Sequence, residues 1–190
     1  MLDRISLERA LLALGELLTD RDQPHEVVAI GGGALSLLGL IERSTNDIDL
    51  VAVVGSTGLE SAQPLPETLL EAIADIARIQ NLDPKWMNSG PTSLMQFGLP
   101  EGFLDRCAPR QFGAFTLFLA TRFDQIHFKV FAAADGRPDD KHHHDLKLLK
   151  PSGTELLAAA RWARTHDPSD GFATMVRGVL ASFGVDFGDG

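Results

Sequence analysis

The sequence predicts an α/β (α+β) protein with a helical C-terminal part, and three features of the 190-residue chain lead to this expectation. Apolar runs at residues 27–31 and 48–54 have the length and composition of buried strands. Beyond residue 121 the pattern is helical throughout. An amphipathic helix ending near Thr19 is predicted ahead of the first strand from the four-three-four spacing of Leu7, Leu11, Leu14 and Leu18.

The remaining elements of the first part follow in order. A short helix over Ala34–Ile41 separates the two strands, and Gly55–Pro66 is typical of a turn-rich connection. Ala114–Ala120 predicts a third strand, whereas residues 84–113 have no regular pattern and no element is assigned to them. A helix over Glu67–Gln80 is predicted from apolar residues that share one face: Leu69, Leu70, Ile73, Ile76 and Ala77.

Four helices are predicted after the third strand: from Thr121 or Arg122 to Ala134, then over residues 139–149, 153–165 and 171–183. Ser152 and Glu155 have the spacing of a capping box, in which the serine hydroxyl accepts from an early amide and the glutamate reaches back. We expect a core over residues 1–121, a helical region over 122–183 and a disordered tail over 184–190.

Composition excludes several classes of protein. No apolar run approaches the roughly 20 residues that span a bilayer, and charged side chains in the first 22 residues argue against a signal peptide. A net charge of −9 argues against an extended nucleic-acid surface. The single cysteine, Cys107, excludes a disulfide framework and fits a reducing cytoplasm.

The most informative motif pairs three glycines with two aspartates. Gly31, Gly32 and Gly33 follow the first strand, and Asp47 and Asp49 open the second. Side chains at i and i+2 of a strand point to one face, so the two carboxylates should converge. Like charges this close repel unless a cation or a proton lies between them. The pattern favours a divalent-metal site beside a glycine turn whose amides could hold phosphate.

Other interpretations of the motif stay open. The glycines could form a tight turn without a ligand, and the aspartates could be solvated turn residues. A dinucleotide-binding fold would also place glycines between strand and helix, with Asp49 near the expected acidic offset. Against that fold, Ser36 stands where a third glycine would be, and the acidic residues begin the second strand instead of ending it.

Gly-Gly-x-Ala-Leu at residues 31–35 and Arg-x-Thr-x-Asp-Ile-Asp-Leu at residues 43–50 resemble the signature of the nucleotidyltransferase superfamily. The chain is most similar to small bacterial nucleotidyltransferase-like proteins, among them toxins of abortive-infection toxin–antitoxin systems. The resemblance extends from Val27 to about Trp162, and its later parts are Trp86-Met87-Asn88, Lys129, His144-Asp145-Leu146 and Glu155-Leu156.

This resemblance implies a mixed sheet flanked by helices, and an activity. Mg²⁺ (or Mn²⁺), held by Asp47 and Asp49, would assist transfer of a nucleoside monophosphate from a nucleoside triphosphate to a hydroxyl. The glycines at 31–33 and Ser36 would hold the triphosphate. Independently of the resemblance, Lys129 interrupts an apolar stretch of sequence, and it would either pair with Asp145 or reach a phosphate. An antitoxin-like protein is the implied partner.

Many superfamily members carry a third carboxylate on a later strand, where it helps to activate the acceptor hydroxyl. The predicted strand 114–120 contains no acid, although Asp105 and Asp124 flank it. Asp124 is the better candidate base because it lies just past the strand's end. The alternative is a catalytically lapsed member that binds a nucleotide or a partner protein as a regulator.

The cluster Asp139-Asp140-Lys141-His142-His143-His144-Asp145 offers a second set of metal-ligating side chains. Three consecutive histidines on a helix point about 100° apart and cannot reach one ion. Asp140 with His144, or His142 with Asp145, could share a metal. Such a run is more typical of a solvated helix start whose acids favour the positive end of the helix dipole.

Overall fold

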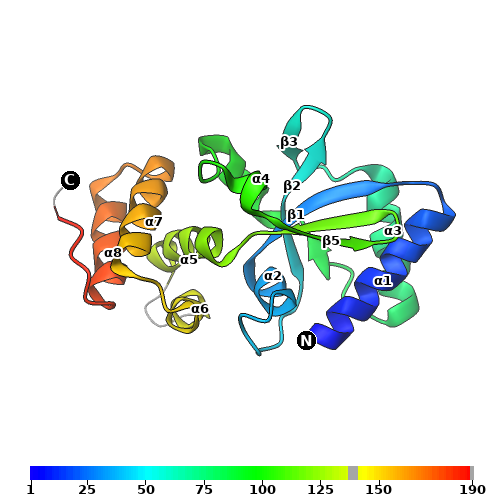
Figure 1. Cartoon of the computed structure of the whole chain (residues 1–190), viewed down its shortest axis with the longest axis horizontal. Helices are drawn as coiled ribbons and strands as arrows, with labels where there is room; N and C mark the ends of the chain where they lie inside the picture. Colours follow the sequence, from blue (N-terminus) through cyan, green and yellow to red (C-terminus); the bar gives the residue numbers. More distant parts are fainter. Residues whose placement is uncertain (137–140, 189–190) are drawn as a thin grey trace. The chain divides into compact units, whose positions relative to one another are not determined.

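A computed structural model describes residues 1–136 and 141–188 (Figure 1). The chain forms two compact units. The first comprises residues 1–98 and 102–121, and the second comprises residues 99–101 and the chain from Arg122 onward. None of the described helices combines the length and the apolar composition that crossing a bilayer requires.

The first unit is built on a six-stranded mixed sheet with the order β3-β2-β1-β6-β5, in which the short β4 pairs with β2. Strand β1 runs antiparallel to β2 and parallel to β6. This confirms the mixed sheet that the resemblance implied. The strands are β1 (His25–Ile30), β2 (Ile48–Gly55), β3 (Gly58–Ser61), β4 (Met87–Asn88), β5 (Ala108–Phe112) and β6 (Phe115–Leu119).

The antiparallel pairing of β1 and β2 excludes the dinucleotide-binding alternative. That fold needs a parallel strand–helix–strand unit, whereas Val28 pairs with Ala52 and Ile30 with Asp49 in antiparallel register. The helix between these strands therefore returns the chain beside β1 in the opposite direction.

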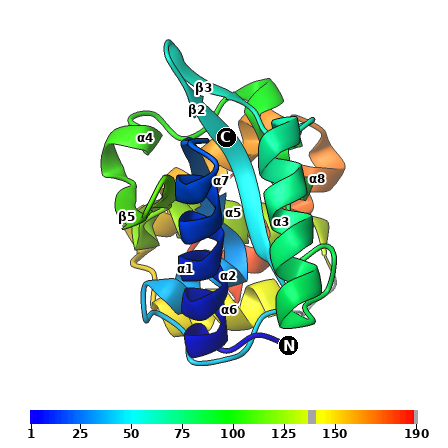
Figure 2. The same ribbon diagram turned by 90° about the vertical axis from the view of Figure 1, so that its right-hand side faces the viewer.

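Helices α1 (Arg4–Asp20) and α3 (Glu67–Gln80) lie side by side over the sheet (Figure 2). The four leucines predicted to line α1 are all fully buried, and α3 has the predicted bounds. Helix α2 (Gly31–Leu37), the 3₁₀ helix η1 (Gly90–Phe97) and α4 (Phe103–Arg106) complete this unit.

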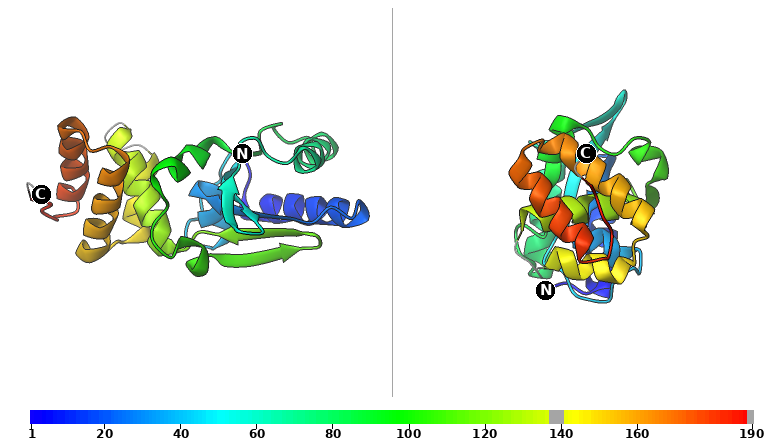
Figure 3. Two further views of the ribbon diagram at one scale, coloured as in Figure 1. Left: turned by 90° about the horizontal axis from the view of Figure 1, so that it is seen from above. Right: turned by 90° about the vertical axis from the view of Figure 1, so that its left-hand side faces the viewer.

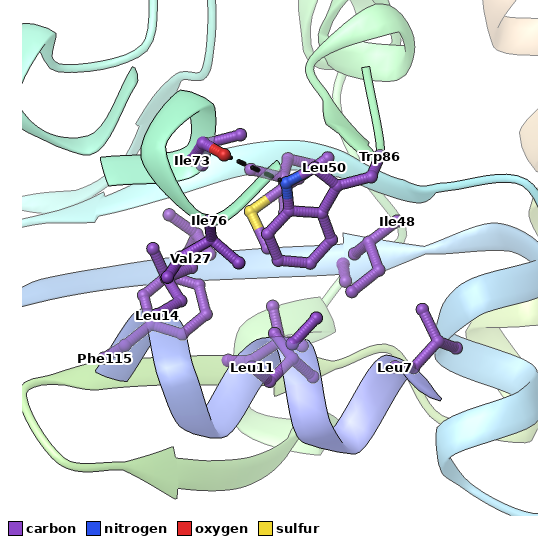
Figure 4. Packing of buried hydrophobic residues seen from close by; sticks show 14 of the residues in the cluster. Leu7, Leu11, Leu14, Val27, Ile48, Leu50, Ile73, Ile76, Trp86 and Phe115 are labelled. Carbon is purple, nitrogen blue, oxygen red and sulfur yellow. Dashed lines mark hydrogen bonds between the residues drawn. The ribbon is translucent and has the colours of Figure 1, made fainter. Parts of the chain in front are cut away.

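Trp86 ties the core to the start of β2 (Figure 4). Its ring is fully buried, and the indole N–H donates to the carbonyl of Ile73 on α3 at 3.1 Å. Its own carbonyl accepts from the amide of Ile48 at 2.7 Å. Because β4 begins directly after Trp86, this anchor places Asn88 beside the first residues of β2.

The structure contains elements that the sequence did not reveal. Strand β3 forms a hairpin with β2 inside the predicted turn-rich connection, and β4, η1, α4 and β5 all lie in the unassigned 84–113 segment. The two-residue β4 is too short for alternation to show, and β5 carries Pro109, a residue depleted in strands. These strands depend on tertiary pairing rather than on local pattern.

The second unit contains helices α5 (Arg122–Asp135), α6 (Lys141–Leu149), α7 (Gly153–His166) and α8 (Asp170–Ala181) (Figure 3, right). The capping box at the start of α7 is present as predicted. Residues 184–188 lie outside helices and strands, and the last two residues of the expected tail lie outside the described part of the chain.

Arg122 connects three helices of the second unit. Its guanidinium donates to the carbonyls of Leu149 and Lys150 at the end of α6, each at 2.8 Å. It also donates to both carboxylate oxygens of Glu155, at 2.5 and 3.2 Å. These hydrogen bonds hold the pKa of Glu155 at about 2, below its usual 4.5.

Helix α1 passes so close to the β5–β6 hairpin that only glycine fits at position 15 (Figure 3, left). A Cβ added to Gly15 would lie 1.8 Å from the carbonyl oxygen of Phe112. The hydroxyl of Thr19, one turn later, accepts from the amide of Ala114 at 2.8 Å. The hairpin is therefore held against the helix by backbone contact.

Gly15→Ala should destabilise the protein by about 2 kcal/mol or more, because the backbone of the hairpin must move to accept the methyl group. Gly178→Ala is the matched control, since position 178 lies within α8 with nothing within 4 Å of the added Cβ. It should gain up to about 1 kcal/mol from helix propensity. Urea denaturation measures both, and equal effects would contradict the close approach.

Acid should weaken the second unit as pH falls from 4.5 towards 2, the interval between the usual pKa of Glu155 and its folded value. A carboxyl whose pKa is lowered by folding stabilises the folded state above its unfolded pKa, and this contribution disappears on protonation. Urea denaturation across this range should show a smaller pH dependence for Glu155→Gln than for the parent. Glu71→Gln, at an exposed position of α3, should retain the parental dependence.

Candidate metal and nucleotide site

The glycine run starts a helix. Helix α2 begins at Gly31, directly after β1, and ends at Leu37, so the predicted helix starts and ends earlier than expected. Gly31 has a φ of +76°, and a Cβ there would lie 2.6 Å from Oδ2 of Asp49. A Cβ on Gly33 would lie 2.8 Å from the carbonyl oxygen of Asp47. Gly31 is therefore required by its left-handed backbone conformation, and Gly33 by the close approach of α2 to the backbone of Asp47.

The two aspartates converge on one amide nitrogen. Asp47 precedes β2, Asp49 is its second residue, and both side chains are half-buried. Nδ2 of Asn88 lies 3.2 Å from Oδ2 of Asp47 and 3.2 Å from Oδ1 of Asp49. Both carboxylates thus face the same small volume at the start of the strand.

Asn88 is a site residue that sequence reasoning missed. It lies on β4, which runs parallel to β2 with Asn88 paired to Asp49. Its Oδ1 accepts from the amide of Gly90 at 2.9 Å. The available signal was the polar residue that follows Trp86 and Met87, but without an assigned strand it could not be placed next to the aspartates.

Arg43 and Thr45 also lie beside the glycine run. A Cβ on Gly32 would be 3.2 Å from Nη2 of Arg43 and 3.2 Å from Oγ1 of Thr45. The Thr45 hydroxyl donates to the carbonyl of Asp47 at 3.2 Å. A guanidinium therefore lies close to the predicted phosphate-binding turn, and Arg43 was not predicted as a site residue.

The loop that carries Arg43 and Thr45 is tied to the N-terminal segment. The amide of Leu2 donates to the carbonyl of Thr45 at 2.6 Å, and the amide of Thr45 donates to the carbonyl of Leu2 at 2.9 Å.

Ser36, on α2, is only 2 % exposed. Its contact with a nucleotide stays a prediction.

The remaining predicted site residues belong to the second unit. Asp124 lies in the first turn of α5 and is fully buried. Nζ of Lys129 lies 2.7 Å from Oδ2 of Asp145, and these side chains are 4 % and 0 % exposed. Of the two roles considered for Lys129, the structure shows the ion pair. The roles of Asp124 as a base and of Lys129 as a phosphate ligand stay predictions.

The histidine-rich cluster lies partly outside the described residues. Asp139 and Asp140 are not among the described residues, so the predicted pairing of Asp140 with His144 lies outside them too. Nε2 of His143 lies 2.9 Å from the hydroxyl of Ser182 on the C-terminal side of α8. Within residues 1–136 and 141–188, no group of three or more histidine, cysteine or acidic side chains is arranged to hold a metal. Cys107 is buried, and its thiol donates to the carbonyl of Phe103 at 3.4 Å.

The chain combines a mixed sheet, two aspartates at the start of one strand and a neighbouring helix that opens with glycines. This combination is typical of a nucleotidyltransferase-like protein. Over residues 7–147 the chain matches the family model described as a nucleotidyltransferase of unknown function (DUF6036), and it belongs to this family. The match confirms the resemblance drawn from the glycine and aspartate motifs. No curated protein and no solved structure matches the chain.

Lys129→Met should destabilise the second unit by about 3–5 kcal/mol, because it leaves the Asp145 carboxylate buried without its cation. The double variant Lys129→Met/Asp145→Leu should recover much of this loss, since both charges are then absent. Lys141→Met, at an exposed position of α6, is the control. Thermal denaturation measures all three, and a parental melting temperature for Lys129→Met would contradict a structural role for the pair.

Proposed function

We propose that this protein is a Mg²⁺-dependent (or Mn²⁺-dependent) nucleotidyltransferase, which moves a nucleoside monophosphate from a nucleoside triphosphate to a hydroxyl acceptor and releases pyrophosphate. One observation carries the proposal. In a chain of this family, the carboxylates of Asp47 and Asp49 converge within 3.2 Å of one nitrogen atom, beside a helix that opens with three glycines.

The donor set at this position fits a hard divalent cation. Carboxylate oxygens are preferred ligands of Mg²⁺, which is commonly held by one or two protein carboxylates together with substrate phosphates. Asp47 and Asp49 would hold the ion. Such an ion bridges phosphate oxygens and neutralises charge that develops during transfer.

The residues around the aspartates suit the triphosphate. The segment 31–33 opens α2 with three glycines, of which Gly31 is half-buried and the other two are buried, and Ser36 lies further along the same helix. Arg43 brings a guanidinium to within 3.2 Å of the position of a Cβ on Gly32, and guanidinium groups bind phosphate through paired donors. We assign phosphate binding to the three glycines, Ser36 and Arg43. We also assign it to Lys129, which must first break its ion pair with Asp145.

The base that accepts the proton of the acceptor hydroxyl is proposed to be Asp124. Strand β6 contains only apolar residues and one threonine, so it supplies no acid. Asp124 is the first carboxylate after that strand. Because it is fully buried, this role requires it to become accessible during the reaction.

A regulatory function is the second candidate, and the neutral side chain at position 88 favours it. The group that faces both aspartates is an amide and not a third carboxylate. A member without a working base would still bind the metal and the nucleotide, and it would act on a partner such as an antitoxin-like protein. A toxin–antitoxin or defence setting is compatible with both candidates.

The proposal predicts that Mg²⁺ or Mn²⁺ with a nucleoside triphosphate stabilises the protein. A ligand at about 100 times its dissociation constant adds about 2.7 kcal/mol, which corresponds to about 5–10 °C in melting temperature for a chain of this size. Asp47→Asn and Asp49→Asn should each abolish the metal-dependent shift and remain folded in EDTA. Asp20→Asn, an exposed charge-matched control, should retain it.

Transfer of label from an α-labelled nucleotide separates the two candidates. An enzyme gives Mg²⁺-dependent labelling that is lost in Asp47→Asn and reduced about 10²–10⁴-fold in Asp124→Asn, the usual contribution of a general base. Asp105→Asn should label like the parent. Nucleotide binding without labelling of a protein, RNA and small-molecule panel would favour the regulator. A complete absence of metal-dependent nucleotide binding would contradict both.

A further inference from the structure

The amide of Asn88 occupies the space between the two carboxylates of the candidate site. Its nitrogen is 3.2 Å from an oxygen of Asp47 and 3.2 Å from an oxygen of Asp49. A side-chain amide has two N–H donors on one nitrogen, so it can serve two acceptors at once. This single group is therefore matched to a pair of carboxylates.

The orientation of the amide is fixed by its other end. The backbone N–H of Gly90 donates to Oδ1 of Asn88 at 2.9 Å. A flipped amide would turn its oxygen towards two carboxylates and its N–H groups towards another donor, which loses all three hydrogen bonds. The network allows one orientation, with the N–H groups facing Asp47 and Asp49.

This orientation separates two roles that an asparagine could have next to a metal. Coordination uses the amide oxygen, and that oxygen is engaged by Gly90 on the side away from the carboxylates. Donation from the nitrogen does something else: it gives an oxygen of each carboxylate the same hydrogen-bond donor and draws the two side chains towards one point.

We propose that Asn88 is a positioning residue, whose amide holds Asp47 and Asp49 in their convergent arrangement while no cation is bound, and which is not itself a metal ligand. Removing the amide takes away the donor that the two carboxylates share, and the like charges move apart. The expected effect of Asn88 on metal affinity rests on the proposed function. Its expected effect on the stability of the metal-free protein is independent of that function.

A double-mutant cycle in EDTA tests the positioning role without metal or nucleotide. Asn88→Ala should lower the melting temperature by about 2–4 °C, a typical shift for a lost interaction of this kind in a chain of this size. The loss should fall to less than half in an Asp49→Asn background, where no charge pair needs the amide. An equal loss in both backgrounds would overturn the proposal and reduce Asn88 to a turn residue that binds Gly90.

Asn88→Asp gives a second variant that keeps the side chain's size and the acceptor for Gly90. In EDTA it places three carboxylates together and should lower the melting temperature more than Asn88→Ala does. Asn46→Asp is the charge-matched control, because Asn46 is exposed and lies next to Asp47 in the sequence. It should melt close to the parent. Equal effects of the two substitutions would also overturn the proposal.

Titration with Mn²⁺ alone, followed by the electron paramagnetic resonance signal of the free ion, supplies a readout that a structural role would not move. Asn88→Ala should weaken Mn²⁺ binding by about tenfold, as loss of an orienting partner does. Asn88→Asp should strengthen it by about tenfold, because a third charge is added to the ligand set. Asn88→Asp is thus expected to lower the melting temperature in EDTA and to strengthen the binding of Mn²⁺.

The outcomes distinguish this inference from the proposed function. If the parent binds Mn²⁺ and both Asn88 variants bind it equally well, the positioning role is wrong and the metal site stands. If the parent binds no Mn²⁺ with or without a nucleoside triphosphate, the proposed function fails, and the cycle in EDTA still decides the role of Asn88.

Discussion

The local structure of the site depends on one steric constraint: α2 must begin closer to the start of β2 than any side chain permits. Positions 31 and 33 each have less than 3 Å between an added Cβ and an oxygen of Asp49 or Asp47. Because β1 and β2 are antiparallel neighbours, with Ile30 opposite Asp49, the chain that leaves β1 crosses the entrance of β2 at once. Gly31, through its positive φ, and Gly33, through its contact with the backbone of Asp47, make this crossing possible.

This constraint changes what the glycine run implies. Packing against the aspartate segment requires Gly31 and Gly33 whether or not a phosphate binds, so the glycines alone are weak support for a nucleotide site. The stronger support for a metal and nucleotide site comes from the two carboxylates, which converge although this brings like charges together. The Asn88 amide contacts both carboxylates in this arrangement, in the space between them.

Local signals predicted the longer helices but neither the short helices η1 and α4 nor the full sheet. Helix α3 and the capping box of α7 follow from side-chain periodicity and from a pairing three residues apart, and both are present. Strands β3, β4 and β5 exist because neighbouring strands supply their hydrogen bonds, and no window of a few residues contains that information. Asn88 was missed for the same reason, since its importance comes from a strand partner about 40 positions earlier in the chain.

The second unit places charge where solvent is excluded. Lys129 interrupts an apolar stretch of sequence, which marked it as unusual, but periodicity could not say whether its partner was a protein carboxylate or a ligand. The structure supplies a partner in Asp145 at 2.7 Å. Charges of this kind are costly to leave unpaired, so α5 and α6 are held in one register by a contact that tolerates few alternatives.

The pairing of Leu2 with Thr45 has a practical consequence for handling the protein. Two backbone hydrogen bonds join the second residue of the chain to the loop that carries Arg43 and leads into Asp47. Met1 is 97 % exposed, so an affinity tag fused ahead of it has room, whereas trimming only two residues would release that loop from its anchor. Removal of residues 1 and 2 takes away both of these hydrogen bonds, so material for biochemistry and crystallisation should retain Leu2.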